Sequence, residues 1–312
     1  MHTCSNRLRA MFPGPIFARA SHASSRGIAT ITGCRTMTDQ TEWTGKVGNV
    51  WAHEWQRTDR SFVPVTERLL EIAASSRFER ALDIGCGAGE ISLRLARGNP
   101  SAQVTGVDVS SDLLAAARER GDGQAKLRFE HGDAAEWTAN AAERPDLLVS
   151  RHGVMFFADP TAAFAHIAGQ ASAQAPLVFS CFRERSVNGW VRELASALPP
   201  SEESAPDPDA PGPFAFGRRE RVEAILAEAG WQDIDFEAID YGMVVGRGDD
   251  AVEDALSYFL RIGPAARAVA TTDDARRGEV IDRLRAVVER HYMDGQVALP
   301  ASCWIVTARA PG

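Results

Sequence analysis

Apolar and polar positions alternate along residues 81–182 in a succession of short strand-like stretches and longer helix-like stretches. Five apolar runs have the length and composition of buried strands, and helical periodicity separates most of them. The runs are 81–84, 104–108, 127–131, 147–149 and 177–179. Two further strands are expected near 234–239 and 303–307. The pattern predicts an α/β fold with a doubly wound, mostly parallel, seven-stranded sheet and helices on both faces.

Three segments lie outside this alternation. Residues 39–76 show helical periodicity and aromatic residues, which predicts N-terminal helices; the family resemblance given below implies that they are lid helices. Residues 182–216 include a proline-rich stretch at 199–213 that is typical of an irregular loop. Residues 249–293 contain two amphipathic helical stretches and form a helical insertion before the last strand. We expect the last two segments to cap a substrate site, while a dimerisation appendage is the alternative for the insertion.

The net charge and the cysteine content of the chain narrow the kinds of molecule that it can bind. The net charge is −8 over 312 residues, which disfavours a nucleic-acid surface or an anionic membrane as the partner. No apolar run is long enough to span a bilayer. The cysteines lie far apart without a C-x-x-C pair, which argues against a zinc site or a disulfide framework and fits a reducing, cytoplasmic location. They are Cys4, Cys34, Cys86, Cys181 and Cys303. A monomer or a homodimer is expected.

Residues 1–38 differ from the rest of the chain because they hold five arginines and several serines but no acidic residue. This composition resembles a mitochondrial transit peptide, which would place the protein in the mitochondrial matrix. An overlong gene start is the alternative that we favour, because Met37 precedes a polar stretch typical of a start. Either alternative predicts a disordered leader ahead of a domain over 39–312.

The strongest local pattern lies in residues 81–90, where an apolar run ends at Asp83-Ile84 and three alternating glycines precede a helix. Gly85, Gly87 and Gly89 accept positive φ and let a ligand approach the backbone closely. The N-terminus of the following helix offers free N–H groups. The pattern predicts a strand, a tight ligand-binding turn and a helix.

Two cofactor classes compete for such a turn. Dinucleotide sites use G-x-G-x-x-G, whereas the spacing here is G-x-G-x-G. Asp83 would repel a pyrophosphate but suits an ammonium group, and Asp108 at the end of the next strand suits ribose hydroxyls. A ligand with an amino acid end and a ribose end, such as S-adenosylmethionine, therefore fits better than NAD.

These motifs together resemble the class I S-adenosylmethionine-dependent methyltransferases. The matching stretches are Asp83–Gly89, Gly106–Ser110 and Gly132–Ala134. Residues 150–157 and 211–216 look like those of the quinone-biosynthesis C-methyltransferases, a subgroup of that family. The resemblance covers roughly 43–308 and implies a Rossmann-like methyltransferase fold with S-adenosyl-L-methionine as the cofactor.

The resemblance also implies which residues contact the cofactor. They are Trp51, Asp83, Gly85, Cys86, Gly87, Gly89, Asp108, Val109, Asp133, Ala134 and Ser150. Asp133 would accept a bond from the adenine amino group, or would cap a helix that starts at Ala134. Trp51 would face the sulfonium or the adenine, or would only pack on the domain.

Methyl transfer requires in-line alignment of the acceptor atom, the methyl group and the sulfur, and orientation alone can lower the barrier by about 7–11 kcal/mol. A base helps when the acceptor is a phenol or an acidic carbon. His152, just past the fourth strand, is the candidate base. Arg151 is the candidate for holding an anionic acceptor oxygen, or for pairing with Asp83 or Asp133. The alternative is that both residues only brace the turn.

The two capping segments are rich in aromatic residues, which predicts a small, aromatic or lipophilic acceptor methylated at carbon or oxygen. The aromatic residues are Phe182, Trp190, Phe214, Phe216, Tyr258 and Phe259. A protein that binds S-adenosylmethionine without catalysis is the alternative function. A Rossmann oxidoreductase is disfavoured by the glycine spacing and by Asp83.

Overall fold

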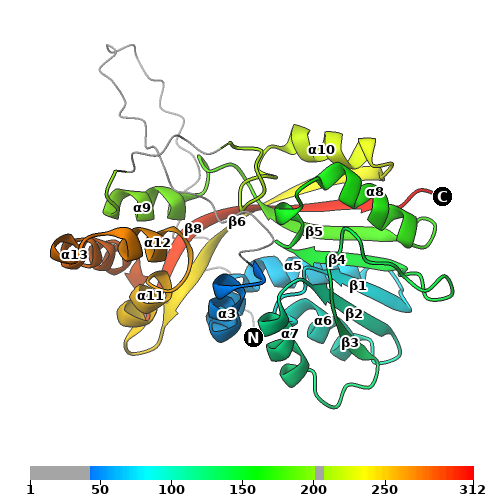
Figure 1. Ribbon diagram of the computed structural model, residues 1–312, viewed down its shortest axis with the longest axis horizontal. Coiled ribbons are helices and arrows are strands. Elements are labelled where there is room, and N and C mark those ends of the chain that lie inside the picture. The colour runs from blue at the N-terminus through cyan, green and yellow to red at the C-terminus, as the bar shows by residue number, and fades with distance from the viewer. Residues whose placement is uncertain (1–42, 201–206) are drawn as a thin grey trace, which may run out of the picture.

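The computed structural model describes residues 43–200 and 207–312, which fold around one large β-sheet (Figure 1). The strands are β1 (Arg80–Ile84), β2 (Gln103–Asp108), β3 (Leu127–His131), β4 (Leu147–Arg151), β5 (Pro176–Phe182), β6 (Gln232–Arg247), β7 (Tyr292–Met293) and β8 (Gln296–Arg309). Their order in the sheet is β3-β2-β1-β4-β5-β8-β6, and the short β7 pairs with β8. Strands β1 to β5 pair in parallel, whereas β8 runs antiparallel to both of its neighbours. The predicted doubly wound, mostly parallel fold is confirmed, with β7 added as an eighth strand.

Helices cover both faces of the sheet. They are α3 (Lys46–His53), α4 (Trp55–Ser61), α5 (Val63–Ala74), α6 (Glu90–Gly98), α7 (Ser111–Arg120), α8 (Pro160–Gln170), α9 (Gly189–Ala197), α10 (Arg219–Glu228), α11 (Ala251–Phe259), α12 (Gly263–Thr271) and α13 (Asp274–Arg290). In Figure 1, α8 and α10 lie on one face and α5, α6 and α7 on the other. Because apolar strands are covered on both sides, their side chains are buried whichever way they point.

Strands β6 and β8 are much longer than the sequence pattern predicted. They pair from Gln232 and Arg309 at one end to Arg247 and Gln296 at the other, and this ribbon extends beyond the parallel strands (Figure 1). The predicted half, 234–239, lies at the exposed end of β6, whereas the missed half, 240–247, is mostly buried. That half contains Gly242 and Gly246, and glycine is depleted in strands, so the pattern did not extend the strand through it.

The far half of the ribbon carries the predicted helical insertion, α11 to α13. Helix α11 packs directly on β6, next to an irregularity in the pairing between Val244 and Gly246. A Cβ atom at Gly246 would lie 2.0 Å from the carbonyl oxygen of Ala251. Only glycine permits this approach, so Gly246 sets how closely the insertion sits on the ribbon.

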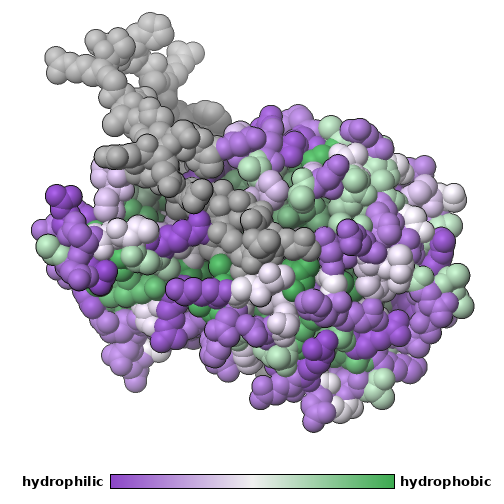
Figure 2. All heavy atoms as spheres, in the orientation of Figure 1, coloured by the Kyte–Doolittle hydropathy of each residue, from purple (hydrophilic) through white to green (hydrophobic). Residues whose placement is uncertain are grey.

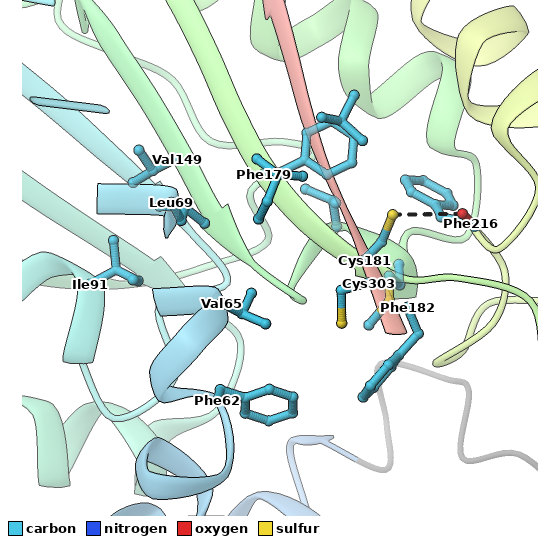
Figure 3. Packing of buried hydrophobic residues seen from close by; sticks show 14 of the residues in the cluster. Phe62, Val65, Leu69, Ile91, Val149, Phe179, Cys181, Phe182, Phe216 and Cys303 are labelled. Atoms are coloured by element: carbon cyan, nitrogen blue, oxygen red, sulfur yellow. Dashed lines mark hydrogen bonds between the residues drawn. The ribbon is translucent and has the colours of Figure 1, made fainter. Parts of the chain in front are cut away.

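The core lies on both sides of the central strands. Phe164, Phe179 and Phe216 are fully buried, and their ring centroids lie 5.7 to 6.3 Å apart. Figure 3 shows Phe179 and Phe216 on one side of the sheet and Val65, Leu69 and other residues on the other. Burying a side chain of this kind contributes roughly 1.5–3 kcal/mol.

The visible surface is mainly hydrophilic, with hydrophobic residues in small patches (Figure 2). Among the described residues, no helix has both the length and the apolar character needed to cross a membrane. The predicted leader at 1–38, and with it the transit-peptide alternative, lies outside the described residues. The division into a lid over 39–76 and two capping segments stays a prediction.

Candidate active site

The glycine turn follows β1 and is held by backbone hydrogen bonds to β2. The N–H groups of Gly85 and Cys86 donate to the carbonyl of Val107 at 2.9 and 3.1 Å. Gly85, Gly87 and Gly89 have φ values of +64°, +53° and +85°. A Cβ atom at Gly85 would meet Gly153 at 2.9 Å, but one at Gly87 would meet nothing within 4 Å. The turn is therefore closed on the Gly85 side and open at Gly87.

Asp108 ends β2 beside this turn. Its Oδ2 accepts a bond from the N–H of Gly87 at 2.8 Å, and its Oδ1 accepts one from Ser110 at 2.8 Å. The side chain of Ser110 in turn caps α7 by accepting a bond from the N–H of Leu113. Burial raises the pKa of Asp108, while these bonds oppose the rise. Each carboxylate oxygen keeps a lone pair for another donor.

Asp83, at the end of β1, has one oxygen that is fully bonded and one that is not. Its Oδ2 accepts bonds from the N–H of Ser92 at 3.0 Å and from the hydroxyl of Ser92 at 2.6 Å. Its Oδ1 is buried without a partner among the described residues. Burial raises the pKa of Asp83 to about 6, against the opposing effects of Ser92 and Arg151. Since buried polar atoms are nearly always paired, this oxygen is suited to a positively charged ligand.

Helix α3 lies against the start of α7. A Cβ atom at Gly48 would be 2.2 Å from the hydroxyl of Ser110, so only glycine permits this contact. On this helix, the ring centroid of Trp51 lies 5.5 Å from that of Trp43, which precedes the helix. The ring centroid of Trp43 lies 5.1 Å from that of Phe156, which follows β4. Trp51 thus belongs to an aromatic group that reaches from the end of β2 to the end of β4.

Among the other predicted cofactor residues, Ser150 braces the turn, since its hydroxyl donates to the carbonyl of Ile84 at 2.7 Å. The thiol of Cys86 is buried, and the carbonyl of Val109 pairs with His131 at 3.0 Å. Asp133 accepts a bond from Ala135 at 2.8 Å.

The prediction that a helix starts at Ala134 is wrong. The structure has turns there instead of a helix. The carboxylate of Asp133 satisfies a nearby N–H group in the turn, and this local bond competes with helix formation.

Arg151 does not pair with Asp83 or Asp133 as the sequence suggested. Its guanidinium binds Asp59 at 2.7 Å and the hydroxyl of Thr66 at 3.0 Å. Asp59 also binds Arg120 at 2.9 Å. Asp59 thus links Arg151 at the end of β4 to Arg120 at the end of α7.

Arg120 reaches the glycine turn from the other side. It binds Glu90 at 2.7 Å, donates to the carbonyl of Ala88 at 2.6 Å and lies 3.7 Å from the ring centre of Trp55. Sequence reasoning missed Asp59 and Arg120, because no motif or spacing links residues so far apart in the chain.

His152 has φ of +65°, which is unusual for a residue other than glycine. Its Nδ1 lies 2.6 Å from the hydroxyl of Ser180, and its Nε2 lies 3.4 Å from the sulfur of Cys303. The ring is buried between Phe62 and Phe182, with centroids at 4.7 and 4.6 Å. Burial, together with Arg151, lowers the pKa of His152 to about 3. The imidazole is therefore neutral at pH 7 and a weak base.

The predicted aromatic enclosure divides into three parts. Phe182, Trp190 and Phe214 form one group, with ring centroids 5.5 to 5.8 Å apart. Phe216 lies in the core instead, against Phe164 and Phe179, because the chain turns inward after residue 214. On α11, Tyr258 and Phe259 are both buried.

Helix α4 is bound to the insertion by charged groups. The buried Glu54 binds Arg57 at 2.9 Å and Arg261 at 2.7 Å. Asp254 on α11 binds Arg57 and Arg60, each at 2.8 Å. Ion pairs therefore join α4 and its N-cap Glu54 to the insertion.

A hollow of about 950 Å³ lies between α5 and α6 at the amino ends of β1 and β2, lined by residues such as Phe78 and Asn99. Ligands of open α/β sheets bind beyond the carboxyl ends of the strands. The glycine turn, Asp83, Asp108 and His152 all lie at that carboxyl edge, so the candidate site is there.

Residues 81–171 match the family model described as a methyltransferase domain. This segment is a methyltransferase domain. It covers β1 to α8, including the glycine turn, Asp108 and His152. The match supports the predicted resemblance to class I methyltransferases, whereas the quinone-biosynthesis subgroup stays a prediction.

Curated relatives match over different lengths. A trans-aconitate 2-methyltransferase of Paracidovorax citrulli is 34% identical over 31% of this chain and 38% of its own length. A malonyl-[acyl-carrier protein] O-methyltransferase of Geobacter sulfurreducens is 28% identical over 78% of this chain and 88% of its own. The chain spans less than half the length of the first curated relatives that it matches.

A solved structure shows the same fold. Phosphoethanolamine N-methyltransferase 2 of Haemonchus contortus, in complex with S-adenosyl-L-methionine, aligns with a TM-score of 0.52 at 17% identity. The alignment covers 92% of this chain and 61% of that one. At this identity the likeness concerns the fold, which agrees with the strand order described above.

Proposed function

We propose that this protein is an S-adenosylmethionine-dependent methyltransferase that acts on a small molecule. The observation that carries the proposal is the unpaired, buried Oδ1 of Asp83 beside a turn that is open at Gly87. A carboxylate in that place suits the ammonium group of an amino acid. The match of residues 81–171 to a methyltransferase domain supports the same cofactor.

The residues around the turn fit the parts of the cofactor. Asp83 holds the ammonium group, and Asp108 accepts bonds from the ribose hydroxyls with its remaining lone pairs. Asp133 accepts a bond from the adenine amino group, and Trp51 covers the ligand from α3. When bound, the cofactor would supply an electrophilic methyl group. S-adenosylhomocysteine would remain once that group has been transferred. The chain's own task is to align an acceptor atom behind that methyl group.

The acceptor meets His152, Arg151 and the aromatic group of Phe182, Trp190 and Phe214. Because His152 is neutral and weakly basic, and both its ring nitrogens already face Ser180 and Cys303, it does not remove a proton from the acceptor. This favours an acceptor oxygen that is already ionised, held near the guanidinium of Arg151.

A carboxylate meets that condition, and the relatives named above are described as acting on trans-aconitate and malonyl-[acyl-carrier protein]. A phenol or quinol of the predicted aromatic class remains the second candidate. The aromatic side chains favour it, because they offer a flat apolar surface to a ring.

Calorimetry with S-adenosylmethionine, S-adenosylhomocysteine and NAD tests the cofactor. We expect the first two to bind and NAD not to bind; the reverse result would contradict the proposal. A screen with a labelled methyl donor then tests trans-aconitate, 4-hydroxybenzoate and hydroquinone as acceptors. Binding without turnover of any acceptor would favour the non-catalytic alternative.

A further inference from the structure

Four buried side chains at the carboxyl edge of the sheet form one hydrogen-bonded chain. The hydroxyl of Ser180 on β5 lies 2.6 Å from Nδ1 of His152. Nε2 of His152 lies 3.4 Å from the sulfur of Cys303 on β8, which lies 3.7 Å from the hydroxyl of Tyr241 on β6. The longer distances fit sulfur, which is larger than nitrogen or oxygen. The chain thus joins β5, the turn after β4, β8 and β6.

The direction of the hydrogen bonds follows from Ser180. Its hydroxyl has no partner but His152 among the described residues, and Ser180 is fully buried. If Nδ1 donated to Ser180, the serine proton would be buried without an acceptor, which is costly. Ser180 therefore donates to Nδ1, so the proton of His152 sits on Nε2 and points at Cys303.

The geometry at Cys303 gives the direction of the bond to Tyr241. Cys303 accepts from His152, and its S–H group donates to the oxygen of Tyr241. The hydroxyl proton of Tyr241 is then left without an acceptor among the described residues. The phenol is nearly buried, with 7% of its surface exposed. A buried donor without an acceptor indicates a ligand group.

The surroundings of Tyr241 belong to the acceptor side of the site. Its pKa is raised, mainly by burial, and Arg151 is near enough to oppose that rise. His152 lies between Phe62 and Phe182, and Figure 3 shows the sulfur of Cys303 pointing toward the side where these two rings lie. The free proton of the phenol is thus close to the cation and the aromatic rings that the acceptor would meet.

We propose that the hydroxyl of Tyr241 donates a hydrogen bond to an oxygen of the methyl acceptor, and that Ser180, His152 and Cys303 are positioning residues that fix it as a donor. This inference rests on the proposed function and names the acceptor's chemistry. The acceptor carries a carboxylate, phenolate or carbonyl oxygen that Tyr241 and Arg151 share. A donor at Tyr241 beside a guanidinium favours such an oxygen over an ammonium group.

Nitrogen-15 NMR of the histidine side chains tests the direction of the chain without any acceptor. The signal of His152 is assigned by its loss in His152→Gln. We expect a proton on Nε2, none on Nδ1, and no titration between about pH 5 and 8. A proton on Nδ1, or titration in that range, would overturn the proposal.

Two matched variants test the contact with the acceptor. Tyr241→Phe removes a hydroxyl whose proton has no acceptor in the protein, whereas Tyr258→Phe removes one that pairs with Thr58 at 3.4 Å. Calorimetry measures the binding of trans-aconitate and of 4-hydroxybenzoate to the complex with S-adenosylhomocysteine. We expect Tyr241→Phe to weaken the better-bound probe roughly tenfold, the loss of one hydrogen bond to a charged group, and Tyr258→Phe to change it less.

The affinity for S-adenosylhomocysteine separates this inference from the proposed function. Both variants should bind it as the wild type does. If the wild type does not bind it, the proposed function fails, while the NMR result still decides the direction of the chain. Equal probe affinity in the wild type and Tyr241→Phe, or no binding of either probe to the wild type, would contradict the role of Tyr241. Ser180→Ala, which keeps the phenol, should weaken the same probe in the same direction.

Discussion

The two ends of the molecule are held together in different ways. At the glycine turn, the key contacts join backbone N–H groups to acidic side chains close in sequence, such as Gly87 to Asp108 at a separation of 21 residues. Where the insertion meets α4, charged side chains join residues far apart, such as Glu54 and Arg261 at a separation of 207. The first end joins neighbouring strand–turn–helix segments, and the second joins segments about two hundred residues apart.

This difference explains why the two ends are unequally visible in the sequence. A turn that needs positive φ selects glycine, and a strand end that must bind a donor selects an acid. Both residue types can therefore be recognised in a short stretch of sequence. An ion pair between helices leaves no local trace, because either partner is also an ordinary surface charge. The difference also predicts that mutations at the glycine turn and mutations between α4 and the insertion affect different properties.

The largest effect is expected at Gly87. Gly87→Val places a branched side chain in the open space of the turn, where the cofactor's amino acid end would lie. We expect the affinity for S-adenosylhomocysteine to fall at least 100-fold by calorimetry, roughly 2.7 kcal/mol. The strain of a valine at φ of +53° adds a loss of stability of about 1–2 kcal/mol.

Gly123→Val is the matched control for that strain. Gly123 has φ of +77° and open space around its Cβ position, but it lies between α7 and β3, away from the turn. It should lose similar stability and keep the affinity. An equal loss of affinity in both variants would show that strain, and not the ligand's place, caused the effect.

The sequence was a good guide to the parallel strands and to the residues that the local chain places together. Asp83, Gly87 and Asp108 follow from a strand-turn-helix pattern, and the structure brings them to one edge of the sheet. It was a poor guide where tertiary contacts decide. Arg151 pairs with Asp59, and neither residue shows this in its surroundings in the chain.

Burial was the other property that the sequence could not supply. His152 looked like a base because an exposed histidine titrates near neutral pH, but its ring is enclosed and its pKa is lowered to about 3. Phe216 was predicted to line the acceptor site, but it packs against Phe164 and Phe179 in the core. The length of β6 was missed although its second half is mostly buried, because Gly242 and Gly246 interrupt the strand pattern there.

The second prediction concerns the buried carboxyl of Asp83. Its pKa in the folded protein is about 6, above the ordinary value of 3.8, so the folded state holds the proton more tightly than the unfolded state does. Stability is therefore lost as the pH rises from about 4 through 6. Relative to Asp83→Asn, the wild type should lose about 2 kcal/mol of unfolding free energy between about pH 4 and 6.

Urea denaturation of both proteins at pH 4, 5, 6 and 7 measures this difference. His152 and all other titrating groups are common to the two proteins, so their contributions cancel. Asp83→Asn should also bind S-adenosylhomocysteine more weakly at pH 7, because an amide does not attract the ammonium group as a carboxylate does. A difference in stability that does not change with pH would show that Asp83 is not perturbed.

The smallest effect is expected where α4 meets the insertion. Glu54 is 4% exposed and binds two arginines, whereas Glu253, on the same insertion, binds Arg285 and is 58% exposed. Glu54→Gln should lower the free energy of unfolding by about 2 kcal/mol, less than for a fully buried pair, because Arg57 and Arg261 keep contact with water. Glu253→Gln should lower it by less than about 1 kcal/mol. Urea denaturation measures both, and calorimetry should find the affinity for S-adenosylhomocysteine unchanged in each. A loss of that affinity in Glu54→Gln would mean that the ion pairs of α4 also shape the glycine turn, and that the two ends are not held independently.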